Sequence, residues 1–255
     1  MRERSAGPRQ PDVRFEELGP SFDSARLDRF YRDVLQPSFP PDELEPLSFM
    51  EAALRAEGGS RARAIVAVAE DGDVLGGVVG YLFDRSQVLL LGYIAVRPDA
   101  RRRGIGVSLL EQARDRWYGD PRCKLAIGEI EDPRHYAGRD SAARMSLYRH
   151  FGFQVLQAPY FQPRVAPDAD RVYHMLLMVL HAVPSIHVES NGHQALSAEV
   201  LRSFLDEYFE DAEGIDATAA DAEIRWLRRF YEGPNVLLLA LDEYDRVPDL
   251  APPAH

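Results

Sequence analysis

The chain has 255 residues, of which 45% are hydrophobic and 28% charged, so it can bury the core of one large domain or of one domain with an appendage. Its net charge of −11 argues against general nucleic-acid binding, which depends on neutralising phosphates, and favours cationic small partners. The single cysteine, Cys123, excludes an intrachain disulfide and a cysteine zinc cluster.

The amino-terminal part predicts a tail, a strand and two helices. Residues 1–12 lack periodicity and predict a disordered tail, and they also lack the apolar core of a secretory signal. Residues 13–18 predict a strand, and apolar side chains recur at helical spacing in 23–39 and 48–59. No window approaches roughly 18 uncharged apolar residues, so we expect a cytoplasmic protein without a membrane anchor.

The central part alternates strands with helices. Strands are predicted at 62–70 and 73–83, joined by the turn DGD, and at 87–96, which is apolar throughout like a strand covered on both faces. The later elements are a helix at 105–117, a strand at 123–132, a helix at 141–153 and an antiparallel pair at 153–163 and 171–181. This order predicts an α/β fold with a mixed sheet.

Residues 183–255 have a different character. They contain 15 acidic and 5 basic residues, and therefore carry most of the net charge of the chain. Two amphipathic helices are predicted at 197–214 and 218–233, followed by a short strand at 235–241. We expect this acidic, mainly helical extension to dock on a first domain formed by residues 13–182.

The segment RRRGIG, residues 101–106, lies between a predicted strand and a predicted helix. One interpretation is a nucleic-acid patch, but the segment is short and belongs to an acidic chain. A second is that its glycines only relieve crowding at a turn between strand and helix. A third interpretation uses every feature: glycines admit a ligand to the backbone, and the helix start offers N–H groups and a positive dipole end to a pyrophosphate.

The spacing R-x-x-G-x-G after a strand resembles the acetyl-CoA loop of the Gcn5-related N-acetyltransferases, the GNAT superfamily. A second segment, SAARMSLYRHFGF at 141–153, is similar to the family pattern N-x-x-A-x-x-L-Y-x-x-x-G-F, with Ser141 in place of the usual Asn and Arg144 in place of Ala. The resemblance covers residues 13–182 and implies the GNAT fold, a mixed, mostly antiparallel central sheet flanked by helices (α+β).

The resemblance also implies where acetyl-CoA would bind. The expected pantetheine contacts are the backbone groups of Ile94, Ala95 and Val96, together with Ser141. The expected pyrophosphate contacts are Arg101, Arg102, Arg103, Gly104, Ile105, Gly106 and Val107.

Two side chains are candidates for proton transfer. The resemblance implies that Tyr148 is the acid that protonates the leaving thiolate; the alternative is a tyrosine that only packs beside Phe151. For the base we favour Glu129, because the segment GEI resembles the L-E-V strand of ribosomal-protein alanine acetyltransferases. Glu131 lies on the same face of the strand and is a rival, and both carboxylates could instead form a solvated edge.

Other polar features are less specific. The segment PYFQP at 159–163 either flanks the acceptor pocket or forms a rigid turn with Tyr160 or Phe161 packed inward. His135 could reach that pocket or lie in solvent, and His174 is expected to be structural. No spacing of His, Cys or carboxylates suggests a metal site, so we expect none.

The sequence therefore predicts a transferase: an acetyl-CoA-dependent N-acetyltransferase (acyltransferase) that moves an acetyl group directly to a primary amine of a cationic small molecule or peptide. The alternative is a catalytically weak or inactive GNAT-fold module that binds or senses acyl-CoA and engages a partner through its acidic extension. Neither nucleic acid nor membrane is expected as a partner, and family resemblance leaves a homodimer open.

Overall fold

The computed structural model describes residues 13–55, 61–136 and 139–249, so the tail expected at 1–12 lies outside the described residues. The strands are β1 (Arg14–Leu18), β2 (Arg61–Val68), β3 (Val74–Phe83), β4 (Val88–Val96), β5 (Leu125–Glu131), β6 (Gln154–Leu156), β7 (Tyr160–Gln162), β8 (Val172–Ala182), β9 (His187–Ser190), β10 (His193–Ser197) and β11 (Asn235–Ala240). The α-helices are α1 (Ser24–Phe30), α2 (Leu47–Leu54), α3 (Ile105–Trp117), α4 (Arg139–His150), α5 (Ala198–Glu213), α6 (Ile215–Ala220) and α7 (Ala222–Arg228). The short helical turns are η1 (Tyr31–Leu35), η2 (Pro41–Glu43), η3 (Pro98–Ala100), η4 (Pro184–Ile186), η5 (Arg229–Tyr231) and η6 (Leu241–Arg246).

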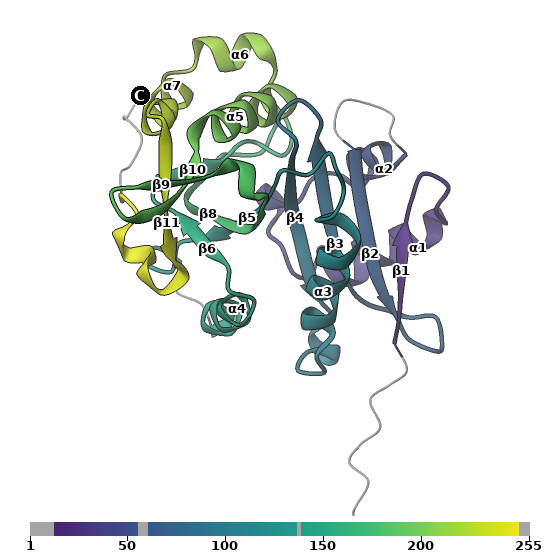
Figure 1. Cartoon of the computed structure of the whole chain (residues 1–255). Helices are drawn as coiled ribbons and strands as arrows, with labels where there is room; N and C mark the ends of the chain where they lie inside the picture. Colours follow the sequence, from purple (N-terminus) through teal and green to yellow (C-terminus); the bar gives the residue numbers. More distant parts are fainter. Residues whose placement is uncertain (1–12, 56–60, 137–138, 250–255) are drawn as a thin grey trace, which may run out of the picture.

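The strands form a sheet in the order β1-β2-β3-β4-β5-β8-β6-β11-β10-β9, with β7 paired to β8 (Figure 1). Neighbouring strands are antiparallel except β4 and β5, which run parallel. The turn DGD joins β2 to β3 as predicted, with Gly72 at a φ of +89° that favours glycine. The prediction of a mixed, mostly antiparallel sheet flanked by helices is confirmed.

Helices cover both faces of the sheet. Buried side chains of α1, α2 and α5 pack on one face, and those of α3 and α4 pack on the other. Along β4 the side chains alternate between the two cores, with Leu90 on the α2 side and Leu89 on the α3 side. Trp117 at the end of α3 and Cys123 are both buried in the second core, as expected for an apolar helix face and a small hydrophobe.

The carboxy-terminal segment continues the sheet. β11 pairs with β6, and β10 and β9 follow outward, so this segment contributes strands as well as the expected helices. β9 and β10 were not predicted, because their side chains are largely exposed and give little alternation of apolar residues. Leu201, Phe204 and Phe209 of α5 belong to the same core as α1 and α2.

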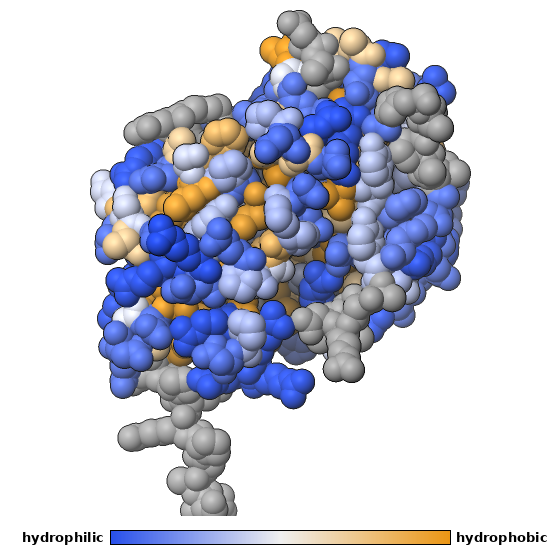
Figure 2. Space-filling model, turned by 180° about the vertical axis from the view of Figure 1, so that it is seen from behind, coloured by the Kyte–Doolittle hydropathy of each residue, from blue (hydrophilic) through white to orange (hydrophobic). Residues whose placement is uncertain are grey.

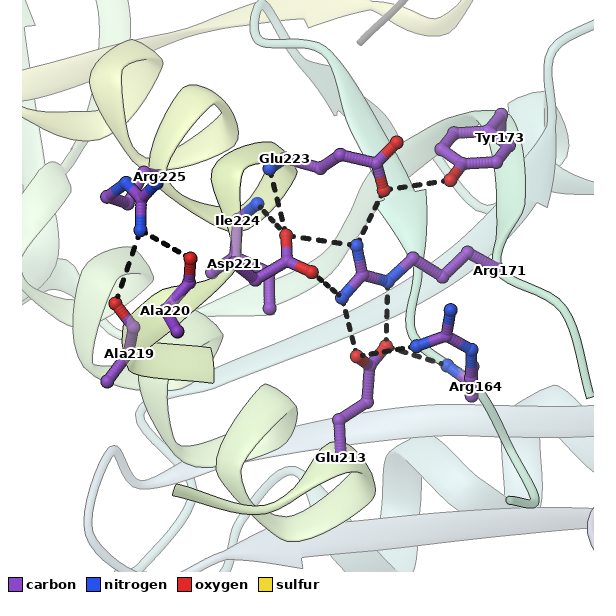
Figure 3. A network of polar contacts seen from close by, with 10 residues as sticks. All are labelled: Arg164, Arg171, Tyr173, Glu213, Ala219, Ala220, Asp221, Glu223, Ile224 and Arg225. Atoms are coloured by element: carbon purple, nitrogen blue, oxygen red, sulfur yellow. Dashed lines mark hydrogen bonds and ion pairs between the residues drawn. The ribbon is translucent and has the colours of Figure 1, made fainter. Parts of the chain in front are cut away.

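A buried ion network fixes the carboxy-terminal helices to the start of β8 (Figure 3). Arg171 has a side chain that is 2% exposed, and its guanidinium contacts Glu213 at 2.5 Å, Asp221 at 2.9 Å and Glu223 at 2.6 Å. These carboxylates come from the end of α5, the residue before α7, and α7. The Tyr173 hydroxyl donates to Glu223 at 2.9 Å, so Arg171 and Tyr173 both bind the same carboxylate of α7.

The surface is mostly hydrophilic. Seen from behind, polar side chains surround smaller apolar areas in the middle of the face (Figure 2). Among the described residues, every helix falls short of the length and apolarity that crossing a bilayer would require.

Candidate active site

Strands β4 and β5 separate halfway along their length. Their parallel pairing ends at Leu91 and Gly128, and beyond it β4 pairs with β3 and β5 pairs with β8. Gly92 marks the separation, because the register between β3 and β4 shifts there as in a β-bulge. Within the described ranges, no strand lies between the facing edges of Gly92–Val96 and Glu129–Glu131. An extended ligand could therefore add to the β4 edge.

The residues expected to contact pantetheine lie at the end of this edge. Ile94, Ala95 and Val96 are the last three residues of β4. The Val96 carbonyl accepts a hydrogen bond from Nε of Arg101 at 3.2 Å, so the arginine ties the following loop to the end of the strand.

The loop after β4 turns sharply into α3. Arg102 and Gly104 have φ angles of +64° and +79°, and Gly104 directly precedes the first helical residue, Ile105. The first hydrogen bond within the helix runs from the Ser108 N–H to the Gly104 carbonyl at 3.0 Å. The N–H groups of the three residues between them have no partner inside the helix, and with the positive end of the helix dipole they form an anion site.

Helix α4 approaches the same place. A Cβ on Gly106 would lie 3.8 Å from Cγ2 of Val96 and 4.0 Å from Cδ2 of Leu147. The end of β4, the start of α3 and the middle of α4 therefore converge. The structure thus brings the two sequence motifs together, with Arg101, Arg102 and Arg103, all three exposed, around the helix start. The side chain of Ser141 lies outside the described residues.

Tyr148 follows Leu147 on α4 and is 7% exposed. Its ring lies 6.1 Å from that of Phe153, so it packs in the core formed by α3 and α4. Burial raises the pKa of the Tyr148 hydroxyl, and the nearby Arg144 offsets this only in part. The hydroxyl therefore keeps its proton at neutral pH and could donate it.

A cavity of about 330 Å³ lies on the α2 and α5 side of the sheet, within the size range of small-molecule sites. Side chains from α2, β3, β4, β5, α5 and the segment after β7 line it. Its carboxylates are Glu45, Glu129 and Asp211, and its tyrosines are Tyr81, Tyr93 and Tyr208. Two of these residues, Tyr208 and Asp211, belong to α5, so the carboxy-terminal segment forms one wall of the cavity.

Glu129 is the first residue of β5 beyond the pairing with β4, and it lines this cavity. Its Oε1 accepts a hydrogen bond from the Tyr160 hydroxyl at 2.5 Å. Burial raises the pKa of Glu129 to about 7, while hydrogen bonds from Tyr160 and Tyr208 oppose the shift and the charge of Glu43 adds to it. A carboxyl group with this pKa can exchange a proton near neutral pH, as a general base requires.

Glu131 has a different environment. It does not line the cavity, and its Oε2 lies 2.5 Å from Nη2 of Arg144 on α4. Arg144 is the residue that departs from the family pattern, and its contact with Glu131 gives that departure a structural role. Of the two rival carboxylates, only Glu129 is placed in the cavity.

The segment PYFQP combines both alternatives considered from the sequence. Phe161 is buried against Phe209, with ring centroids 5.4 Å apart, and Tyr160 packs inward onto Glu129. Gln162 lines the cavity.

The two histidines lie elsewhere. His135 does not line the cavity; its ring stacks on that of His174 with centroids 3.8 Å apart, and its Nε2 lies 2.8 Å from Oδ1 of Asp249. In the part of the chain that the structure describes, these three residues form a group whose ligand atoms could hold a metal ion. Sequence spacing did not indicate it, because His135, His174 and Asp249 are separated by 39 and 75 positions.

Sequence reasoning missed Glu45, Tyr93, Tyr208 and Asp211. In the sequence, Tyr208 follows Leu205 at helical spacing and so belongs to the apolar face of the helix predicted at 197–214. One signal was present: Tyr208 and Asp211 are three positions apart and therefore share a helix face, so a carboxylate lies beside the apolar stripe.

Comparison with known proteins agrees with this arrangement. A family model described as an acetyltransferase (GNAT) domain matches residues 61–155, from β2 to β6. A search of curated proteins gave no match.

Solved structures are also similar to this chain. A protein described as an acetyltransferase of the GNAT family from Bacteroides thetaiotaomicron superposes with a TM-score of 0.51 at 22% identity, over 68% of this chain and 89% of that one. Diaminobutyrate acetyltransferase from Paenibacillus lautus, solved with L-2,4-diaminobutyric acid and coenzyme A, has a TM-score of 0.47 at 16% identity, over 66% and 94%. Ribosomal-protein-S18-alanine N-acetyltransferase from Escherichia coli has a TM-score of 0.43 at 16% identity, over 67% and 96%.

Proposed function

Because this chain carries a GNAT acetyltransferase domain and has the GNAT fold, we propose that it is an acetyl-CoA-dependent N-acetyltransferase acting on a primary amine. The observation that carries the proposal is the separation of β4 from β5. The edge of β4 that this separation leaves unpaired begins at Gly92, which lines the cavity together with Glu129, and ends at Val96, which lies beside the start of α3. The start of α3 fits a pyrophosphate, and the cavity, with a carboxyl group whose pKa is about 7, fits an amine that must lose a proton.

The residues of the chain then have separate tasks. Bound acetyl-CoA would supply an activated thioester, its phosphates at the start of α3 and its pantetheine along Ile94–Val96. In a direct transfer, the amine nitrogen bonds to the carbonyl carbon and the carbon–sulfur bond breaks. The proton of the amine passes to Glu129, through water or directly, and the Tyr148 hydroxyl gives its proton to the thiolate.

Gly104→Glu tests the assignment of the loop. We expect acetyl-CoA affinity to fall by at least about 100-fold, because a carboxylate facing the phosphates costs several kcal/mol. The substitution also puts a side chain at a φ of +79°. Calorimetric titration of acetyl-CoA measures the effect. Gly119→Glu adds the same charge in open space beyond the other end of α3 and is the matched control. Equal affinity of all three proteins would contradict the assignment.

Tyr148→Phe tests the proposed acid. We expect single-turnover acetyl transfer to slow by about 100-fold, the lower range for general acid catalysis, while acetyl-CoA still binds. Rapid-quench measurement of acetylated amine gives the rate. Tyr118→Phe removes another buried tyrosine hydroxyl from the same core and is the control. If both variants transfer at the wild-type rate, Tyr148 only packs.

An acyl-CoA sensor remains the second candidate, on the observation that Arg144 replaces the usual alanine and pairs with Glu131. Release of free thiol from acetyl-CoA across a panel of primary amines separates the two functions. A sensor binds acetyl-CoA and releases no thiol above the rate of hydrolysis with any amine.

A further inference from the structure

Two buried polar atoms of residues that line the cavity have no hydrogen-bond partner. They are Oε1 of Glu45 and the hydroxyl of Tyr81; in the described ranges the only other such side-chain atoms belong to Ser86 and Tyr118, which do not line the cavity. A buried polar atom without a partner costs about 1–3 kcal/mol, so proteins rarely leave one. Two of them in residues that line one cavity indicate a ligand that supplies the missing hydrogen bonds.

The backbone of Glu45 is held firmly in place. Its N–H donates to the Tyr93 hydroxyl at 3.0 Å, and its carbonyl accepts from the Tyr31 hydroxyl at 2.9 Å. Both backbone groups of Glu45 therefore have hydrogen-bond partners. Since the backbone is fixed in this way, the missing partner of Oε1 does not result from an irregular loop. In its ionised form the Glu45 carboxylate can only accept hydrogen bonds, so a ligand group that stabilises this form must be a donor.

Acidic side chains outnumber basic ones in the lining of the cavity, with Glu45, Glu129 and Asp211 against Arg164. Burial and the charge of Asp211 raise the pKa of Glu45 to about 8, which is the effect of a carboxylate that lacks a positive partner. The basic residue that lines the cavity, Arg164, is 3.3 Å from Glu213 of the buried ion network, so its charge is already matched there. A cationic group on the ligand would supply the positive partner that Glu45 lacks.

Aromatic rings connect Glu45 with the proposed base. Tyr93 and Tyr208 both line the cavity. Burial raises the pKa of each hydroxyl, and the charges of Glu45 and Glu129 raise it further, so both tyrosines lie near both carboxyl groups. Tyr81 meets Tyr93 edge-on with ring centroids 6.5 Å apart. Such walls suit the methylene groups of an aliphatic chain and the positive charge of an ammonium group.

We propose that Glu45, with the Tyr81 hydroxyl, binds a second and positively charged amino group of the acceptor, so that the preferred acceptor is a diamine. The inference rests on the proposed function. One amino group would lie at Glu129 and lose a proton, while the other would stay charged at Glu45. The two carboxyl groups thus divide the tasks of catalysis and selection.

The test compares diamines with a monoamine of the same length. Thiol release from acetyl-CoA is measured with 1,3-diaminopropane, 1,4-diaminobutane, 1,5-diaminopentane, spermidine and n-butylamine. We expect the best of the four diamine-containing compounds to exceed n-butylamine at least about 10-fold in kcat/KM, the effect of one charged hydrogen bond. Glu45→Gln should lower that ratio by about 10-fold or more, and Tyr81→Phe should lower it in the same direction.

Glu43→Gln is the matched control, because it removes a carboxylate two positions away that does not line the cavity. It should leave the ratio of diamine to monoamine unchanged. A ratio near one in the wild type, or an equal fall in Glu45→Gln and Glu43→Gln, overturns the proposal while leaving the acetyltransferase function intact. If no amine is acetylated, calorimetry with 1,4-diaminobutane decides: tighter binding to the wild type than to Glu45→Gln supports the diamine site alone, and equal binding overturns it.

Discussion

Glu129→Gln is expected to reduce kcat for amine acetylation by about 100- to 10,000-fold, the range that a positioned general base contributes. Glutamine keeps the shape of the side chain and can still accept the hydrogen bond from Tyr160, but it cannot take a proton. Steady-state thiol release with the best amine of the panel measures the loss.

The pH dependence gives a second readout. The carboxylate form of Glu129 is the base, and burial raises its pKa to about 7, so kcat/KM should rise with pH through about 7 and then level off. Tyr160→Phe removes a hydrogen bond that favours the carboxylate, and the rise should then move to higher pH. Glu129→Gln should lose this rise altogether.

The stability of Glu129→Gln shows whether a loss of activity comes from the missing base or from misfolding. A carboxyl group whose pKa is raised in the folded state binds its proton more tightly there, so the protein loses stability as pH rises from the ordinary glutamate range through about 7. Glu129→Gln removes this penalty and should be at least as stable as the wild type at pH 8, by thermal unfolding. An inactive variant with lower stability at that pH would not support the assignment.

Glu131→Gln is the control for Glu129→Gln. Glu131 pairs with Arg144 and does not line the cavity, so its loss should change kcat far less. If Glu131→Gln is the inactive variant and Glu129→Gln is active, the base has been assigned to the wrong carboxylate.

The framework of the fold could be predicted from the sequence because its signals are local. The apolar run of β4, the turn DGD between β2 and β3, and the helical spacing of Ile105, Leu109, Ala113 and Trp117 each depend on a few neighbouring residues. β9 and β10 escaped prediction, because an exposed pair at the edge of a sheet has little apolar patterning. β9 and β10 pair with each other, but their connection to the rest of the sheet depends on β11, which comes 38 residues after the end of β10.

The candidate site was only partly predictable, because some of its residues lie in local motifs and others come together only in the folded chain. The loop and the tyrosine helix are continuous motifs, so residues from Arg101 to Val107 and Tyr148 could be proposed from the family resemblance that these motifs carry. The cavity is assembled from η2–α2, β3–β5 and α5, and its composition appears only when these segments meet. Glu45 carries no motif, and the separation of β4 from β5 at Gly92 follows from a bulge that sequence does not mark.

Arg171→Met is expected to lower the free energy of unfolding by about 3–5 kcal/mol, the cost of removing one partner from a buried ion pair. Glu213 and Glu223 are 4% and 5% exposed at their side chains, and without Arg171 their charges would stay buried. Urea unfolding followed by circular dichroism measures the change.

The control is Arg85→Met, which breaks another ion pair to α5. Arg85 contacts Glu210 at 2.8 Å, but its side chain is 53% exposed, so the loss should be about 1 kcal/mol or less. Equal losses in the two variants would mean that burial does not set the energy of the Arg171 network. The network also holds Arg164 and α5, which line the cavity. A substitution at Arg171, outside the cavity, should therefore also raise KM for the amine in conditions where the variant remains folded.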